Sequence, residues 1–246
     1  MLPQLPDGFT ALITGASGGI GSALVDALLD EPRLARLHAI SRRPVVRDDE
    51  RLTPHTLDLA TEQGLEALGK ALDGQPLHLV INAMGMLHDE TDGIAPEKKL
   101  DDLDAVALGR LLHVNAVTPA LLLKTLTPSL KGHHTALIGS LSARVGSIDD
   151  NRLGGWYAYR ASKAAHNMLM KTASVELRRL NPNACLLCLH PGTTDTALSA
   201  PFQSRVPEGK LFTPSFVAER LLAVMSERLP SDTGEFRDWN DQPIAW

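Results

Sequence analysis

Cysteine is scarce in this chain of 246 residues, which has only two. They form the motif Cys185-Leu-Leu-Cys188 inside NACLLCLH, an apolar run that predicts a buried strand. Because side chains three positions apart on a strand point to opposite faces, a shared metal ion or a disulfide is not expected for this pair. A disulfide-rich scaffold is also excluded by so few cysteines.

Long apolar runs and basic segments are lacking as well. No stretch of about 18 apolar residues is evident, and the N-terminal MLPQLPDGFTALITG has no signal-peptide pattern. The net charge is -5, and no long Lys/Arg run occurs, which argues against nucleic acid or an anionic membrane as a partner. These absences predict a cytoplasmic protein whose partners are small molecules.

The apolar residues that are present predict alternating strands and helices. Near-continuous apolar runs of strand length span 9–14, 37–41, 55–59, 77–82, 135–140 and 184–190. Segments with helical spacing of apolar residues lie between them, at 20–29, 62–72, 102–126 and 159–180. A last helix after Pro214 and a short strand near GEFRDW follow. The order predicts one α/β domain, 1–246, with the doubly wound parallel sheet of a Rossmann fold.

Two segments without a regular pattern follow predicted strands, at 88–99 and 199–213. Such folds bind ligands at the carboxyl ends of their parallel strands, where these loops are expected to lie. The second segment is the candidate substrate lid, within a substrate loop at about 193–213.

The turn TGASGGIG after the first predicted strand has two competing interpretations. Gly15-Ala-Ser17-Gly-Gly19 matches the nucleophile elbow of α/β-hydrolases, which would make Ser17 a nucleophile. That fold takes part of its oxyanion hole from a loop after an earlier strand, and none is predicted here. The alternative is a dinucleotide cradle, in which Gly15, Gly19 and Gly21 let the backbone approach a pyrophosphate. The cradle is the stronger interpretation.

Ser41-Arg42-Arg43 follows the second predicted strand, about 20 residues beyond the cradle. NAD enzymes place an acidic residue near this position, on the ribose 2′-hydroxyl, whereas an arginine suits the 2′-phosphate of NADP. A guanidinium is permanently charged and can bind phosphate through two hydrogen bonds. The simpler interpretation is a solvated pair of arginines. We predict NADP(H) in preference to NAD(H).

Both tyrosines of the chain lie in the stretch GGWYAYRASK. On a helix, Lys163 lies one turn after Tyr159 and on the same face. Tyr157 has no lysine at that distance and is expected to pack, or to line a pocket, beside Trp156. An ammonium group stabilises a phenolate, so Lys163 is expected to lower the pKa of Tyr159 toward neutrality. Such a tyrosine can exchange a proton with a carbonyl or alcohol oxygen.

Several motifs occur in one order along the chain. They are Thr14-Gly-x-x-x-Gly19-x-Gly21, Asn82 ending the fourth strand, Asn115 in the next helix, Ser142 after the fifth strand, and Tyr159-x-x-x-Lys163. In these motifs the chain resembles the short-chain dehydrogenase/reductase (SDR) family over essentially its full length. SARVGSIDDNRLGGWYAYRASKAA and HPGTTDT are most similar to the branch of C-factor-like and Sniffer-like carbonyl reductases. The resemblance implies an NADP(H)-dependent reductase of an aldehyde or ketone.

The resemblance also implies the catalytic residues. Tyr159 is then the general acid/base, and Lys163 binds the nicotinamide ribose. Ser142 holds the substrate oxygen, with Ser140 as the alternative serine, and Asn115 positions a water in the proton relay. This chemistry needs no metal, and the histidines show no metal-ligand spacing with a carboxylate partner.

The implied cofactor site draws on the turns after several strands. Its residues are Gly15, Ser17, Gly19, Ile20 and Gly21 in the cradle, Ser41, Arg42 and Arg43 around the 2′-phosphate, Asp58 and Leu59 at the adenine, Asn82, Ala83 and Gly85 at the ribose, and Pro191, Gly192, Thr194 and Thr196 at the carboxamide and pyrophosphate. One departure from the family is that Asn-Asn-Ala-Gly reads Asn82-Ala83-Met84-Gly85. The missing asparagine is expected to affect the sheet more than the chemistry.

Assembly and biological role follow from the same resemblance. The family commonly pairs through the two long helices that hold Asn115 and Tyr159, so a homodimer or a homotetramer is expected. The alternative function is that of a regulatory or signalling protein of C-factor type, which binds NAD(P) without a dedicated metabolic substrate.

Overall fold

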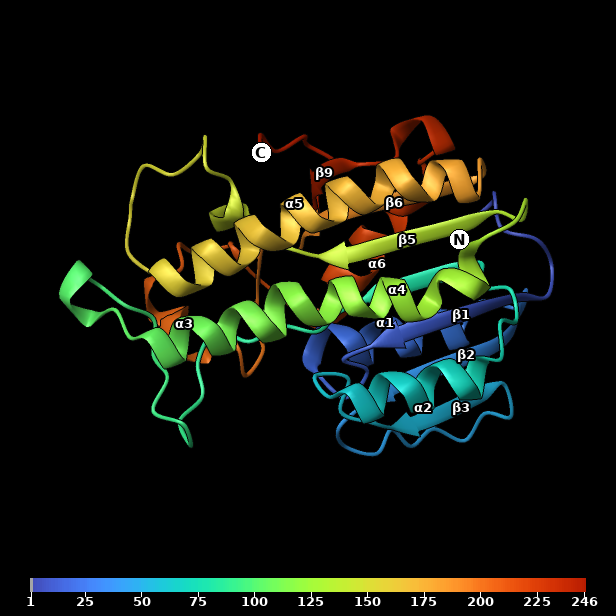
Figure 1. Cartoon of the computed structure of the whole chain (residues 1–246), viewed down its shortest axis with the longest axis horizontal. Coiled ribbons are helices and arrows are strands. Elements are labelled where there is room, and N and C mark those ends of the chain that lie inside the picture. Colours follow the sequence, from blue (N-terminus) through green and yellow to red (C-terminus); the bar gives the residue numbers. More distant parts are fainter. Residues whose placement is uncertain (1) are drawn as a thin grey trace.

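Seven parallel strands form the central sheet of this structure, a computed structural model that describes residues 2–246. In spatial order they are β3 (Leu52–Thr56), β2 (Leu34–Ser41), β1 (Phe9–Thr14), β4 (Leu79–Asn82), β5 (Ala136–Leu141), β6 (Ala184–His190) and β9 (Glu235–Asp238). Strands are added outward in one direction from β1 to β3 and then in the other from β4 onward (Figure 1). This is the doubly wound fold that the alternation predicts, in a single domain.

Helices cover both faces of the sheet (Figure 1). One layer holds α2 (Glu62–Leu72), α3 (Ala105–Leu112), α4 (Thr118–Leu130) and α5 (Tyr157–Leu180). The other holds α1 (Gly19–Leu29) and α6 (Pro214–Ser226). Because both faces are covered, each strand buries successive side chains in alternate layers, which explains the near-continuous apolar runs.

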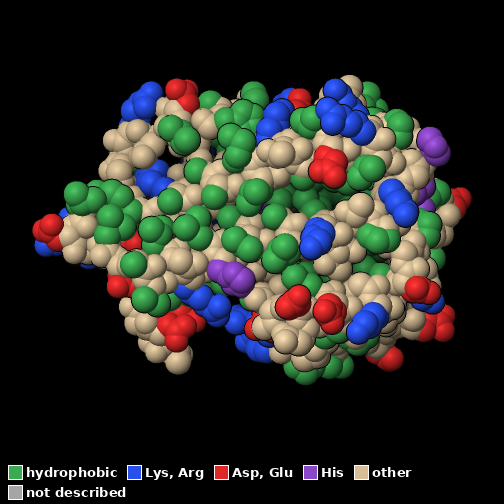
Figure 2. All heavy atoms as spheres, in the orientation of Figure 1, with side chains coloured by type: hydrophobic (Ala, Val, Ile, Leu, Met, Phe, Trp, Pro, Cys, Tyr) green, Lys and Arg blue, Asp and Glu red, His purple; other side chains and the backbone are tan. Residues whose placement is uncertain are grey.

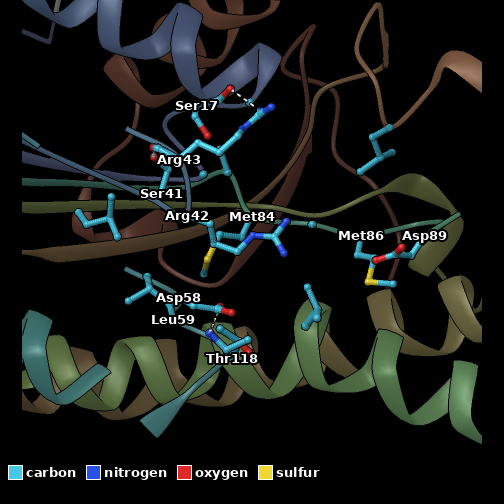
Figure 3. A pocket seen from close by; sticks show the side chains of 18 of the residues that line it. Ser17, Ser41, Arg42, Arg43, Asp58, Leu59, Met84, Met86, Asp89 and Thr118 are labelled. Atoms are coloured by element: carbon cyan, nitrogen blue, oxygen red, sulfur yellow. Dashed lines mark hydrogen bonds between the residues drawn. The ribbon is translucent and has the colours of Figure 1, made fainter. Parts of the chain in front are cut away.

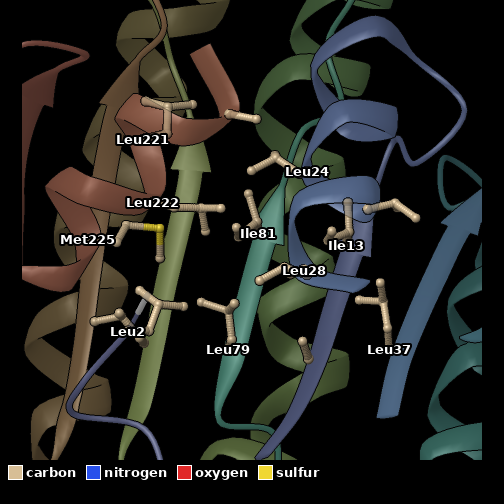
Figure 4. Close-up of a cluster of buried hydrophobic side chains, with 14 of the residues drawn as sticks. Leu2, Ile13, Leu24, Leu28, Leu37, Leu79, Ile81, Leu221, Leu222 and Met225 are labelled. Atoms are coloured by element: carbon tan, nitrogen blue, oxygen red, sulfur yellow. The ribbon is translucent and has the colours of Figure 1, made fainter. Parts of the chain in front are cut away.

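The layer under α1 and α6 is a closely packed aliphatic cluster. Figure 4 shows Leu24 and Leu28 of α1 and Leu221, Leu222 and Met225 of α6 above Ile13, Leu79 and Ile81 of the strands. Cys185 belongs to this cluster, whereas Cys188 belongs to the cluster under α4 and α5. Both thiols are free and buried, and their opposite faces confirm the prediction made from strand geometry.

The edge strand β3 departs from its predicted position. It spans Leu52–Thr56 instead of 55–59, and it contains Pro54. Proline has no N–H to donate and is tolerated in an edge strand, where only one side pairs with a neighbour. The predicted site residues Asp58 and Leu59 therefore lie after the strand, in the turn that leads into α2.

The predicted helix 102–126 is a continuous helical rod from Ala105 to Leu130, with a π-helical turn at His113–Val117 between α3 and α4. By length and composition alone this rod is apolar enough to cross a membrane, with a mean hydropathy of 1.5. The sequence expectation concerned an unbroken run of apolar residues, and Arg110, His113 and Asn115 interrupt this rod. In the structure the rod is one of the helices that cover the sheet. Of its most apolar stretch of 18 residues, 39% is buried.

Apolar side chains also lie on the outer surface of α4 and α5. Figure 2 shows hydrophobic side chains over these helices. They include Leu121 of α4 and Met168 and Leu169 of α5, which are 37%, 67% and 38% exposed. We call this surface, defined by Leu121, Met168 and Leu169, the α4/α5 apolar face.

Candidate active site

A cavity of about 640 Å³ opens at the carboxyl ends of β1, β2 and β4. Predicted cofactor residues that line it are Gly15, Ser17, Ser41, Arg42, Arg43, Asp58, Leu59, Ala83 and Gly85. The other predicted residues lie outside its lining: Gly19, Ile20, Gly21, Asn82, Tyr159, Lys163, Pro191, Gly192, Thr194 and Thr196. The cavity therefore lies where the strand order reverses, which is the ligand position expected for this fold.

The turn between β1 and α1 has no room for side chains at its glycines. Gly15 has φ +68°, and a Cβ there would lie 2.7 Å from the carbonyl oxygen of Ala83. A Cβ on Gly21 would lie 2.1 Å from the carbonyl oxygen of Gly15. No side chain caps the N-terminus of α1, where Gly18 is the N-cap residue. The backbone N–H groups at the start of α1 are thus suited to an anion such as a pyrophosphate.

The two arginines after β2 differ in their surroundings. Arg43 donates a hydrogen bond to the carbonyl oxygen of Ser17, at 3.2 Å, and so bridges the two turns. Figure 3 shows Arg42 extending into the cavity, with Arg43 turned toward Ser17. Arg42 makes no hydrogen bond or ion pair with the described residues 2–246, so its guanidinium remains available to an anionic ligand.

Asn82 joins the ends of three neighbouring strands. Its Oδ1 accepts a hydrogen bond from Thr14 Oγ1 of β1 at 2.7 Å, and its Nδ2 donates to Ser140 Oγ of β5 at 2.9 Å. Ser140, the alternative catalytic serine, is therefore engaged within the sheet. Ser142 lies beyond the end of β5, where its side chain is buried.

Asn115 lies in the π-helical turn, and its side chain binds the loop after β4. The amide accepts from the Met86 backbone N–H and donates to the Met86 carbonyl, both at 2.8 Å, and it donates to Ser162 Oγ of α5 at 3.0 Å. A Cβ built on Gly85 would lie 3.8 Å from Lys163 Nζ and 3.9 Å from Asn115 Oδ1. Asn115 thus connects the loop after β4 with the helix that carries the tyrosine.

Tyr159 and Lys163 share one face of α5, as predicted. Lys163 Nζ lies 5.8 Å from the centre of the Tyr159 ring and donates a hydrogen bond to the Leu141 carbonyl at 3.0 Å. Leu141 immediately precedes Ser142, so the tyrosine, the lysine and the serine gather at the carboxyl end of β5. Within the described part of the chain, the Tyr159 hydroxyl makes no hydrogen bond.

The electrostatics of this pair differ from the sequence prediction. Burial raises the pKa of Tyr159, and burial lowers the pKa of Lys163 to about 8. Desolvation disfavours the charged form of each group, and the lysine is bonded to a backbone carbonyl. The expected lowering of the tyrosine pKa toward neutrality is therefore wrong for this structure, and Tyr159 keeps its proton at neutral pH.

Aromatic rings lie beside Tyr159. The Trp156 ring is 6.2 Å from that of Tyr159 and 4.8 Å from that of Phe202, measured between ring centres. His88 lies 6.3 Å from Phe202. Tyr157 is 37% exposed. Of the neighbours Trp156 and Tyr157, it is therefore Trp156 that packs against Tyr159.

The predicted loops are partly ordered into secondary structure. Segment 199–213 contains the 3-10 helix Ala200–Arg205 and the strand β8 (Leu211–Phe212), which pairs with β7 (Thr193–Thr194). In segment 88–99, the Glu97 carboxylate accepts a hydrogen bond from the Ala158 backbone N–H at 3.3 Å. The first turn of α5, which holds the tyrosine, is thereby anchored to this loop.

Sequence reasoning missed several residues that line the cavity. Arg110, Val114 and Thr118 come from the helical rod, and Figure 3 shows Thr118 near Asp58 and Leu59. Their spacing of four residues was the available signal, because it places them on one helix face. A second observation concerns Thr194, whose hydroxyl is buried and without a hydrogen-bond partner among residues 2–246. Thr194 lies outside the lining of the cavity.

Comparisons with known proteins agree with this geometry. The family model described as short chain dehydrogenase matches residues 9–206. The benzil reductase ((S)-benzoin forming) of Bacillus subtilis (strain 168) is 28% identical over 240 residues, covering 88% of this chain and 93% of that protein. C-signal of Myxococcus xanthus is 30% identical over 148 residues, covering 60% of this chain and 83% of that protein.

A solved structure extends the comparison to a bound cofactor. The NADPH-bound carbonyl reductase from chicken fatty liver superposes with a TM-score of 0.84 at 26% identity, covering 98% of this chain and 95% of that chain. The glycine cradle and the arginines fit a nicotinamide cofactor in the present chain. The chain belongs to the short chain dehydrogenase family, and it is an oxidoreductase that acts on carbonyl or alcohol groups.

Proposed function

We propose that this enzyme reduces an aldehyde or ketone to an alcohol with NADPH, and that Tyr159 donates the proton. The observation that carries this proposal is the gathering of Tyr159, Lys163 and Ser142 at the carboxyl end of β5, next to the loop after β4 that lines the cavity. The cofactor supplies the hydride, so the protein has to orient the reactants and stabilise charge.

Each residue of the set has a distinct task in the proposed reaction. Tyr159 delivers a proton to the carbonyl oxygen as the hydride reaches the carbon. Ser142 donates a hydrogen bond to the same oxygen while negative charge develops on it. Lys163 binds the nicotinamide ribose, and Asn115 positions a water of the proton relay.

The raised pKa of Tyr159 favours the protonated phenol, which is the form that reduction requires. Burial raises this pKa, so the phenol is protonated at neutral pH and ready to act as an acid. Oxidation of an alcohol needs the phenolate as a base, and the raised pKa makes this form scarce. A preference for NADPH, which we assign to Arg42, is consistent with the same direction.

The proposal is tested by assaying a panel of aliphatic and aromatic aldehydes and ketones, benzil among them, with NADPH and with NADH. We expect NADPH oxidation with at least one aromatic carbonyl, because Trp156 and Phe202 lie beside Tyr159. NADPH binding without oxidation by any carbonyl would favour the regulatory alternative. The similarity with C-signal is the reason for considering that alternative.

The segment 193–213 is our proposed substrate loop, since its residue Phe202 contacts Trp156 beside the tyrosine. We place the enzyme in the cytoplasm on the sequence features alone. Cofactor and carbonyl substrate are then its partners, together with a second copy of the chain.

We further propose that the chain forms a homodimer or homotetramer through the α4/α5 apolar face. Such a patch on the surface is suited to burial against an identical patch. Leu121→Glu is expected to shift the protein toward monomer, because it places a charge in an apolar interface. Sedimentation equilibrium measures this shift, and an unchanged assembly would exclude this face as the interface.

A further inference from the structure

A buried asparagine lies directly behind the proposed catalytic serine. Ser142 Oγ donates a hydrogen bond to Asn167 Oδ1 at 2.6 Å, and both residues are only 3% exposed. Asn167 follows Lys163 by one turn and Tyr159 by two turns on α5, so all three share a helix face. The Asn167 Nδ2 group is buried and has no hydrogen-bond partner within residues 2–246.

The direction of this hydrogen bond matters for catalysis. A serine hydroxyl has a single proton, and in the structure that proton is directed to Asn167. To stabilise the oxygen of a carbonyl substrate, Ser142 has to donate the same proton toward the substrate. The resting arrangement is therefore one in which the serine is not yet a donor to the substrate.

The amide of Asn167 can serve both arrangements. Its two ends have nearly the same shape, but one accepts a hydrogen bond and the other donates two. A half-turn of the amide would bring Nδ2 to Ser142 Oγ and release the serine proton. The unpartnered Nδ2 would then gain a partner, in exchange for the one that Oδ1 gives up.

We propose that Asn167 is a positioning residue that sets the direction of the Ser142 hydroxyl proton. Its Oδ1 holds that proton in the resting enzyme, and its Nδ2 donates to Ser142 Oγ when the serine binds the substrate oxygen. This inference rests on the proposed carbonyl reduction, since it assigns a donor role to Ser142.

Two variants separate the acceptor and donor functions of the amide. Asn167→Asp keeps the shape and, as a carboxylate, only accepts hydrogen bonds, so it should hold the serine proton inward and lower kcat about a hundredfold, as loss of an oxyanion donor does. Asn167→Leu keeps the volume without either function and should lower kcat roughly tenfold, because the serine is unheld but free to turn. The dissociation constant for NADPH, from fluorescence titration, should stay unchanged in both.

The double variant Ser142→Ala/Asn167→Leu tests whether the two residues act as one unit. We expect its kcat to equal that of Ser142→Ala alone, because the asparagine has no hydroxyl left to direct. This comparison also decides the matter if the aspartate variant does not fold. Additive losses, or an Asn167→Leu enzyme with wild-type kcat, would overturn the inference.

The matched control is Asn181, a buried asparagine at the other end of α5, whose Nδ2 donates hydrogen bonds to the Leu130 and His134 carbonyls. Asn181→Leu should lower thermal stability and leave the kcat of the folded enzyme unchanged. An equal fall in kcat for both leucine variants would mean that the effect is structural, against our inference. If the wild type reduces no carbonyl, the proposed function itself fails, and the inference with it.

Discussion

Replacing Tyr159 by phenylalanine should abolish carbonyl reduction and leave NADPH binding nearly intact. The phenyl ring keeps the packing against Trp156, and the lost hydroxyl makes no hydrogen bond within residues 2–246, so the fold should be unaffected. What is lost is the proton donor, and general acid catalysis contributes about 10²–10⁴-fold to such a reaction. Steady-state assays of NADPH oxidation with an accepted carbonyl, together with NADPH titration, measure the two quantities separately.

Tyr157 provides the control within the same turn of helix. It lies two positions earlier on α5 and is 37% exposed, away from the lysine that faces Tyr159. Tyr157→Phe should therefore keep the wild-type kcat. An active Tyr159→Phe enzyme would refute the proposed role of Tyr159, whatever the control does.

Reversing the charge of Arg42 should move the cofactor preference from NADPH toward NADH. We expect kcat/KM for NADPH to fall about a hundredfold, because hydrogen bonds to charged groups contribute about 1.5–3 kcal/mol and a carboxylate would also repel the 2′-phosphate. The value for NADH should change little. Arg42→Glu is preferred to a change at Arg43, since Arg43 also binds the Ser17 carbonyl and supports the glycine turn.

Arg36 of β2, the strand that precedes Arg42, offers a matched charge reversal. It is exposed on β2, in a part of the strand that does not line the cavity, so Arg36→Glu alters the net charge without reaching the cofactor. The ratio of kcat/KM values for NADPH and NADH should be unchanged in this control. If Arg42→Glu also leaves the ratio unchanged, the arginines are a solvated pair at the strand end.

Much of the fold was predictable because its signals are local. Apolar strand runs, helical spacing and the glycine turn each lie within a short window, and they recover the parallel sheet and the place of the cavity. Strand ends were less predictable, as β3 illustrates. Pro54 argues against a strand there, and only the edge position in the sheet makes it acceptable.

The candidate residues of the site could be named from the sequence, but their surroundings could not. Spacing along one helix was enough to single out Tyr159 and Lys163. It did not reveal the π-helical turn around Asn115, nor the contact of Phe202 with Trp156, because these depend on segments far apart in the sequence. Asn167 carried no signal as a partner of Ser142, for the same reason.

By itself, the sequence determined the strand and helix order, the glycine turn and the order of the catalytic motifs. These follow from residue type and from the spacing of residues within single elements. Only the tertiary structure decided the direction of the Tyr159 pKa and the partner of Ser142. Both result from burial at the carboxyl end of β5, where α5 and the strand remove the side chains from water.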